Sequence, residues 1–383
     1  MKIFLTMLLC VCLTMSLVGC AETTPETSQL PATNSDESPH MQAIALPQIN
    51  ETTYADDGGT LFCLSLQQIQ LLLHHTAAEE KISGELQKRT EALLTHAAQI
   101  EAQAQADYPG NEYWSEYFIE SSYDPTRLDQ SVLSLFVNTS SYSGGTHPSL
   151  ETDSVTYDLQ SGDAIFLDDL LTQDCNTGRL YQLLLNRLEN QAEELYDDYA
   201  DALSDRFTGE LHSIQNWYLS TTGLCFHFAP YDIAPYSSGT IIAELPYSTL
   251  SGILKEKYFP TDSTAATGSI YAETYIEDDS ERFDHITDVA LCEDGSQILL
   301  YSDATVTDLR IETGSRYSDF EGSTTSTTVF AASGLNVGEA IHLSADIENQ
   351  DALFRLVYRS GNKEYSSFIT YDELGDAIVL TNG

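Results

Sequence analysis

The side chains best suited to chemistry are nine histidines and several adjacent pairs of acidic residues. Metal sites and catalytic centres need such residues at set spacings, yet H-x-x-x-H, H-E-x-x-H, G-x-S-x-G and phosphate-loop motifs do not occur. His74-His75 cannot present both rings to one ion, and Asp56-Asp57-Gly58 has the residue types of a tight turn. Asp168-Asp169 and Asp278-Asp279 could help to bind calcium but lack EF-hand spacing, which favours solvated turns. We therefore expect no catalytic residue, no metal and no cofactor.

Two loops rich in tyrosine, glycine and proline are the best candidates for binding a ligand. In Tyr142–Pro148, two adjacent glycines let backbone N–H groups approach a ligand, or simply permit an unusual turn. His147 either contacts a ligand or caps this loop. Phe226–Gly239 could present a rigid tyrosine surface of the kind that favours recognition, while His227 is expected on a strand face. The candidate ligand-binding residues are Tyr142, Ser143, Gly144, Gly145, His147, Tyr231 and Tyr236.

The N-terminus predicts where the protein works. Lys2, an apolar stretch and a small-residue ending indicate a signal peptide over residues 1–19, too short to be a permanent membrane helix. Leu17-Val18-Gly19-Cys20 resembles the lipobox of bacterial lipoproteins, which implies that Cys20 is acylated. The chain would then be lipid-anchored to the bacterial cell membrane, on its extracytoplasmic side. The alternative is an ordinary secretory signal that happens to end near a cysteine.

Four cysteines remain besides Cys20 and the two in the signal peptide: Cys63, Cys175, Cys225 and Cys292. Their number permits disulfides in an exported protein, but their wide spacing shows no disulfide framework. Buried free thiols are favoured, although the pairing stays open. A C-x-x-C motif is absent from the chain after Cys20, so a zinc ribbon or a thioredoxin-like site has no support.

The net charge of the chain excludes some classes of binding partner. The sequence contains 59 acidic and 16 basic residues, a net charge of −43. Nucleic acids and anionic membrane surfaces would be repelled, so we expect no nucleic-acid binding. Basic proteins, cations and neutral glycans remain possible partners, and the charge could also serve only solubility.

The candidate loops need a scaffold, and the first two thirds of the chain predict an α+β fold. Residues 20–44 are expected to be a disordered tether. Helical periodicity predicts two amphipathic helices, over 83–104 and 176–207, with a small helix over 247–258. Strand-like runs are expected at 45–54, 60–66, 116–122, 131–142, 154–159, 164–167, 217–219, 223–228 and 240–245, with turns at 55–59, 123–126 and 160–163. These elements predict a mixed antiparallel sheet covered by two helices over residues 45–258.

The last third of the chain has a different pattern. Residues 259–268 are small and polar, as in a linker. Beyond them, short β-like runs occur at 270–276, 287–291, 297–301, 327–331, 340–343, 354–358 and 365–370. Such spacing predicts a small all-β sandwich or barrel over residues 269–383.

Several motifs carry a resemblance to a known domain. Tyr142–Pro148, Tyr157-Asp158-Leu159, Leu167–Leu170 and Phe228–Gly239 followed by Glu244–Tyr247 are similar, in order, to the RsiV-type extracytoplasmic domain. The likeness covers residues 45–258, and its first part is similar to the domain that precedes the catalytic module of PdaC-type peptidoglycan deacetylases. Because RsiV binds lysozyme, the resemblance implies lysozyme binding here. Nothing cytoplasmic is expected before the signal peptide, so sigma-factor inhibition is not implied.

Together these patterns predict a membrane-anchored, non-enzymatic binding module. Its expected partners are the membrane, through the lipid on Cys20, and either a basic protein such as lysozyme or cell-wall peptidoglycan. The alternatives are an accessory of a peptidoglycan-modifying enzyme or a structural lipoprotein of the envelope.

Overall fold

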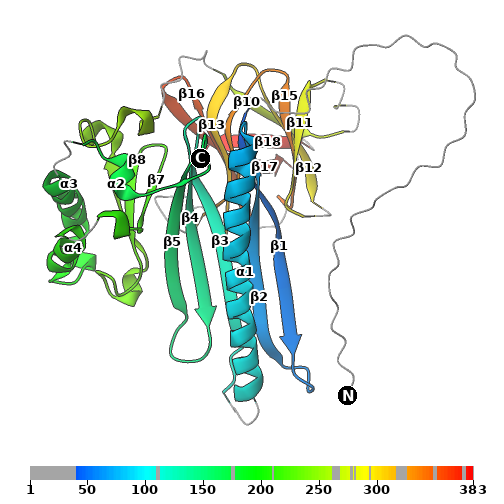
Figure 1. Cartoon of the computed structure of the whole chain (residues 1–383). Helices are drawn as coiled ribbons and strands as arrows, with labels where there is room; N and C mark the ends of the chain where they lie inside the picture. The colour runs from blue at the N-terminus through cyan, green and yellow to red at the C-terminus, as the bar shows by residue number, and fades with distance from the viewer. Residues whose placement is uncertain are drawn as a thin grey trace, which may run out of the picture. The chain divides into compact units, whose positions relative to one another are not determined.

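Strands dominate the computed structural model, which describes residues 40–108, 113–173, 177–208, 211–260, 268–276, 279, 282–292, 295–315, 326–347, 352–372 and 377–382 (Figure 1). The signal peptide, Cys20 and most of the expected tether lie outside these residues, as do Cys175, Asp278 and most of the expected linker. Residues 37–383 form one compact unit. Its described residues form an 11-stranded, a 4-stranded and a 3-stranded sheet.

The 11-stranded sheet is the largest of the three described sheets. All neighbouring pairs in it are antiparallel except β2 and β3. In spatial order its strands are β18 (Ala377–Asn382), β17 (Lys363–Asp372), β16 (Leu353–Ser360), β13 (Val306–Gly314), β14 (Thr327–Leu335), β1 (Gln42–Tyr54), β2 (Thr60–Leu72), β3 (Tyr117–Leu128), β4 (Val132–Tyr142), β5 (Ser149–Asp158) and β6 (Ala164–Ile165). The predicted hairpin of β1 and β2 is confirmed, although β1 begins at Gln42 within the segment expected to be tether.

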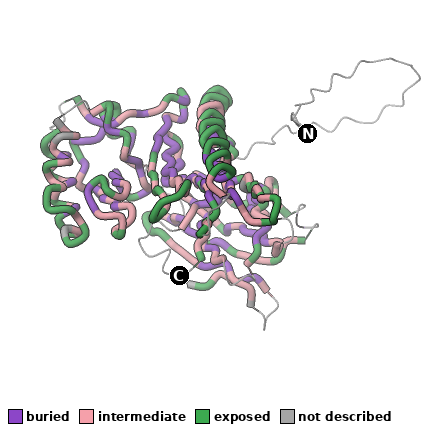
Figure 2. Tube along the Cα trace, turned by 90° about the horizontal axis from the view of Figure 1, so that it is seen from below, coloured by how far each residue is buried: buried purple, intermediate pink, exposed green. Residues whose placement is uncertain are grey.

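One long helix covers part of this sheet. α1 (Thr76–Asp107) includes the helix predicted over 83–104 and lies along β2 and β3 in Figure 1. Ile82 and Leu86 pack into one cluster of the sheet, and Ala97, Ile100 and Ala104 into a second. Most of the remaining helix surface is exposed, as the tube in Figure 2 shows. The amphipathic pattern therefore predicted both the helix and its buried face.

The second predicted helix was wrong: the segment is broken into shorter helices, and these do not cover the large sheet. Residues 176–207 were expected to be one helix, but they contain α3 (Thr177–Leu188), a 3₁₀ segment (Glu189–Glu194) and α4 (Tyr199–Thr208). The helix breaks at the acidic segment 189–198, because neighbouring carboxylates repel one another within a helix and aspartate favours helix starts. The backbone carbonyl of Asp198 accepts the first bonds of α4 from Asp201 and Ala202.

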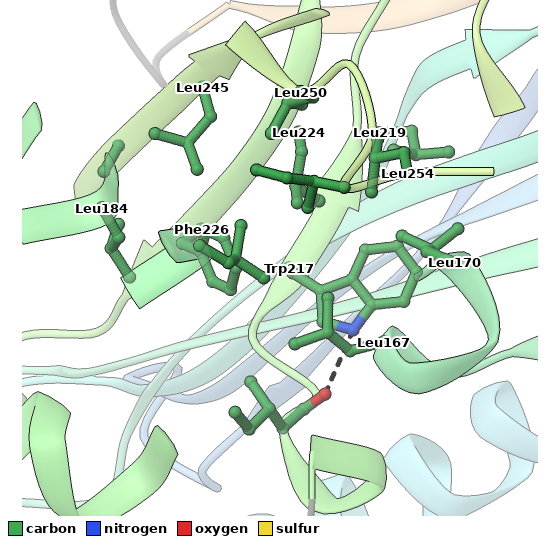
Figure 3. Packing of buried hydrophobic residues seen from close by; sticks show 14 of the residues in the cluster. Leu167, Leu170, Leu184, Trp217, Leu219, Leu224, Phe226, Leu245, Leu250 and Leu254 are labelled. Atoms are coloured by element: carbon green, nitrogen blue, oxygen red, sulfur yellow. Dashed lines mark hydrogen bonds between the residues drawn. The ribbon is translucent and has the colours of Figure 1, made fainter. Parts of the chain in front are cut away.

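These short helices pack on the 3-stranded sheet formed by β7 (Trp217–Leu219), β8 (Gly223–Phe228) and β9 (Ile241–Pro246). Figure 3 shows Trp217 among the leucines of this core, its indole N–H donating to the Ile214 carbonyl at 3.1 Å. A short helix, α2 (Leu167–Leu170), contributes two of those leucines. The helix expected over 247–258 was wrong: only the 3₁₀ turns Tyr247–Thr249 and Glu256–Tyr258 form, because Gly252 interrupts them with φ of 73°.

The turn predicted at Tyr123–Thr126 was also wrong, since these residues lie inside β3. Pro125 is tolerated there because a bulge lies between it and Arg127 in the pairing with β4. The chain reverses instead at Asp129, whose carboxylate accepts the backbone N–H groups of Ser131 and Val132 at 2.8 and 3.1 Å.

The C-terminal strands form one end of the 11-stranded sheet and all of the 4-stranded sheet, and both sheets contribute to one core. The second sheet contains β10 (Ile270–Thr274), β12 (Ser296–Ser302), β15 (Glu339–Ala345) and β11 (His285–Ala290). β13 and β18 are additional to the predicted strands. A bulge at Asp308, with φ of 50°, disrupts the alternation that would have revealed β13.

The C-terminal strands are not separate from the preceding strands. The first residues of β1 pair with β14, with Gln42 opposite Ala332 and Ile44 opposite Phe330. The large sheet therefore runs through both segments that the sequence suggested as domains, 45–258 and 269–383.

Candidate functional site

The two candidate loops meet. The His147 ring stacks on Tyr236 with centroids 4.0 Å apart, and its Nε2 lies 3.0 Å from the Tyr231 hydroxyl. The Tyr231 and Tyr236 rings are 5.9 Å apart. We refer to His147, Tyr231 and Tyr236 as the aromatic cluster. Because it joins residues 84 positions apart in sequence, it depends on the tertiary fold.

The first loop owes its shape to its glycines. Gly144 and Gly145 have φ of 100° and 116°, a region that side chains disfavour, and a Cβ on Gly144 would lie 2.7 Å from the Tyr117 hydroxyl. Tyr142 fixes the turn by donating from its hydroxyl to the Gly145 carbonyl at 3.0 Å. The glycines and Tyr142 therefore shape the loop that carries His147. Ser143, between them, is exposed.

The second loop holds Tyr231 in a strained conformation. Tyr231 has φ of 75°, although it is not a glycine, and its side chain is 57% exposed. The loop is held by the buried Ile233 and Ala234 and by a 2.8 Å bond from the Tyr231 N–H to the Ala234 carbonyl. Strain of this kind is concentrated at functional sites, and here it presents a large aromatic side chain to solvent.

The hydrogen bonds define how the cluster is protonated when His147 is neutral. Nδ1 of His147 lies 2.9 Å from the Pro148 carbonyl, which can only accept, so Nδ1 carries the proton. Nε2 is then an acceptor, and the Tyr231 hydroxyl donates to it. His147 thus both caps its own loop and contacts the other loop.

His227 lies beneath the surface and serves the fold. It is 1% exposed, with Nδ1 3.0 Å from the Thr152 hydroxyl and Nε2 2.9 Å from the Ser154 hydroxyl. The Ser154 hydroxyl lies 2.6 Å from the Trp217 carbonyl and donates to it, so it accepts from Nε2–H of His227. Burial lowers the pKa of His227 to about 4, which keeps it neutral. This network joins β5 to β7 and β8.

Asp56-Asp57 lies in a turn, as expected. Solvated turns were wrong for Asp168-Asp169, which lies in α2, and for Asp279, which is 2% exposed and accepts a bond from Arg282. Asp57 accepts the N–H of Gly59 at 3.0 Å and the Tyr108 hydroxyl at 2.8 Å, and these bonds lower its pKa. Asp168 lies in the first turn of α2, 3.2 Å from Nδ1 of His212. In the described ranges, no three histidine, cysteine or acidic side chains are grouped to hold a metal. Cys63, Cys225 and Cys292 are free thiols there, with Cys225 buried.

Beyond the first loop, Tyr142 continues into an aromatic row that the sequence patterns did not predict. Tyr117 lies between Tyr142 and Trp114, at 5.7 and 4.8 Å, and Trp114 contacts Tyr108 at 5.3 Å. Tyr113 and Tyr54 are 87% and 62% exposed. The density of aromatics between positions 108 and 118 was the available signal.

Comparisons with known proteins identify one domain. Residues 168–248 match the family described as "Protein of unknown function (DUF3298)", so the match includes Tyr231 and Tyr236 but not His147. The structure is similar to that of a DUF3298 family member from Bacteroides fragilis NCTC 9343 (TM-score 0.43, 21% identity), covering 57% of this chain and 94% of that one. A DUF3298 family protein from Pseudomonas aeruginosa PAO1 is also similar (TM-score 0.42, 13% identity, 57% and 96% coverage).

No curated protein sequence matches the chain. Within the described ranges, no helix is both long and apolar enough to span a membrane. The resemblance expected over residues 45–258 is thus supported over residues 168–248. Over residues 168–248 the chain carries a DUF3298 domain, the RsiV/PdaC-type domain, whose family description assigns no function.

Proposed function

We propose that this chain is a membrane-anchored extracytoplasmic lipoprotein whose folded body binds a basic protein of the lysozyme kind. The observation that carries the proposal is the aromatic cluster, which brings both candidate loops to one surface. Exposed tyrosines are favoured anchors at protein interfaces because they bury a large area with few rotatable bonds. The DUF3298 domain supports a ligand like that of RsiV.

The distribution of charge supports a basic partner. Lysine and arginine are absent from residues 41–80, 90–126, 128–178 and 207–254. These segments supply both loops and the aromatic row. Arg206, which reaches the second loop, is paired with Asp232 at 3.3 Å. An aromatic surface on segments without lysine or arginine, in a chain of net charge −43, favours a basic protein and speeds its association.

Calorimetric titration of residues 37–383 with lysozyme tests this proposal. Tyr231→Gly is expected to weaken binding at least about tenfold, because it removes the exposed ring and its bond to His147. Glycine accepts a φ of 75° without strain, so the melting temperature should not fall.

The matched control is Tyr271→Ala, which removes a tyrosine that is 44% exposed on β10. It should bind lysozyme like the original chain. Absence of heat at both low and physiological salt would eliminate lysozyme as the ligand. Equal losses in both variants would show that the aromatic cluster is not the binding surface.

Anchoring is tested separately on the full chain. Cys20→Ser is expected to move the protein from the membrane fraction to the soluble fraction and to abolish labelling with a fatty-acid analogue, because a serine hydroxyl does not replace the acylated thiol. Cys63→Ser is the control and should stay membrane-bound. Retention of the Cys20 variant in salt-washed membranes would contradict the lipid anchor.

A further inference from the structure

A polar hollow of about 330 Å³ lies on the large sheet, away from α1. Its lining residues come from β2, β3 and β4: Ser65, Glu120, Ser121, Ser122, Asn138 and Ser140. Phe62, Leu64 and Ile119 pack into the core with α1. Since side chains alternate along a strand, Ser65, Glu120 and Ser122 face the opposite way. The volume is at the lower end of the range of small-ligand sites, about 300–1,000 Å³.

Four of the side chains that line this hollow have free hydrogen-bonding capacity. Among the described residues, the side chains of Glu120, Ser122, Asn138 and Ser140 make no hydrogen bond or ion pair with one another or with any neighbour. They stand as two directly opposed pairs across β3 and β4, Glu120 with Ser140 and Ser122 with Asn138. The hollow therefore presents hydroxyl and amide groups, which can both donate and accept, and a carboxylate, which accepts.

Aromatic side chains lie beyond both ends of these two opposed pairs. The pair beyond Glu120 and Ser140 is Phe118 with Tyr142, whose rings stack with centroids 6.2 Å apart, and both are half-buried. At the other end, Phe136 packs against Tyr218 of β7 at 5.2 Å. The exposed surface of the Phe118–Tyr142 pair can support an apolar ring face beside the polar groups.

The chemistry of the hollow favours a neutral ligand. Among the described residues that line it, Glu120 is the only one with a charged side chain. The surrounding segments 41–80, 90–126 and 128–178 contain no lysine or arginine, so an anion would be repelled. One carboxylate is too few to hold a divalent cation. The backbone groups of β3 already pair with β2 and β4, so the hollow cannot take an added peptide strand.

We propose that the polar hollow binds a neutral saccharide. Sugar hydroxyl and acetamido groups would bond to Glu120, Ser122, Asn138 and Ser140, and the apolar face of a sugar ring would stack on Phe118 and Tyr142. This inference goes beyond the proposed function: the site and the ligand class differ from those of the aromatic cluster.

The probe is tetra-N-acetylchitotetraose, a neutral sugar oligomer, titrated into residues 37–383 and followed by calorimetry. Binding should be nearly independent of salt, and Asn138→Leu should weaken it at least about tenfold because one amide loses its sugar partners. Thr52→Leu is the matched control, an exposed residue of the same sheet face that does not line the hollow. It should bind the tetramer unchanged.

Two results would overturn the inference. One is no binding of the tetramer; the other is binding only of its deacetylated, cationic form with loss of that binding at physiological salt, which would indicate general attraction to an acidic surface. Tyr231→Gly should keep saccharide binding, so failure here and failure of the lysozyme proposal are distinguishable. Melting curves show whether Asn138→Leu stays folded, and Ser122→Ala gives a second, milder test.

Discussion

Replacement of Arg127 by methionine is expected to lower the free energy of unfolding by about 3–5 kcal/mol. Arg127 is 2% exposed, and its guanidinium donates to Asp129, to the Tyr247 hydroxyl and to the Tyr258 carbonyl, each at 2.6 Å. Removing the guanidinium leaves the Asp129 carboxylate and a buried carbonyl without their main partner. It also disconnects the end of β3 from the segment that follows the 3-stranded sheet.

Urea denaturation of residues 37–383 measures this effect. Arg206→Met is the control, because Arg206 is 36% exposed and its ion pair with Asp232 should contribute less than about 1 kcal/mol. Arg127→Lys should recover only part of the loss, since an ammonium group cannot reproduce the fork of guanidinium bonds. A loss below about 1 kcal/mol in Arg127→Met would contradict the assigned role.

Acidification from pH 6.5 to pH 4 is expected to remove about 3 kcal/mol of stability through His227. Burial lowers its pKa to about 4 in the folded chain, whereas the unfolded chain takes up this proton near pH 6.5. The unfolded state therefore binds more protons between these values, and stability falls as the pH falls.

Asp124 acts in the opposite direction over much of the same range. Burial raises its pKa to about 6 from 3.8, and Glu312 adds to the rise. Its protonation therefore favours the folded state as the pH falls. Because the two effects partly cancel, the informative quantity is the difference in stability between the original chain and His227→Gln.

Unfolding free energies of both chains across this pH range provide the measurement. Glutamine keeps one donor and one acceptor for Ser154 and Thr152 but does not titrate, so its curve should lack the loss due to His227. His96→Gln, on an exposed position of α1, is the control and should follow the original chain. Parallel curves for the original chain and His227→Gln would rule out this histidine as a source of acid sensitivity.

Local patterns predicted elements well where one periodicity continued without interruption. The helix over 83–104 has apolar residues every three or four positions, and α1 formed around it. The second helix failed because the same spacing continued across the acidic segment 189–198, where carboxylate repulsion and a new helix start break it. β13 was missed because a bulge interrupts its alternation at Asp308.

The candidate site was only partly predictable, for a topological reason. The residue types of both loops indicated recognition, but the contact between His147 and Tyr231 depends on how β5 packs beside β7 and β8. The polar hollow likewise needs the register of three strands. Arg127 did have a signal, since it is the only basic residue between positions 90 and 178. A lone cation in so acidic a segment indicates a partner inside the fold.

The pairing of β1 with both β2 and β14 has a mechanical consequence. If Cys20 is anchored, any pull on the folded body enters at His40 and passes into β1, which begins at Gln42 in the interior of the large sheet. The first residues of β1 are bonded along both edges, so a force along the strand loads many hydrogen bonds at once. A lipid-tethered receptor built this way would resist traction by a bound partner far better than one pulled from an edge strand.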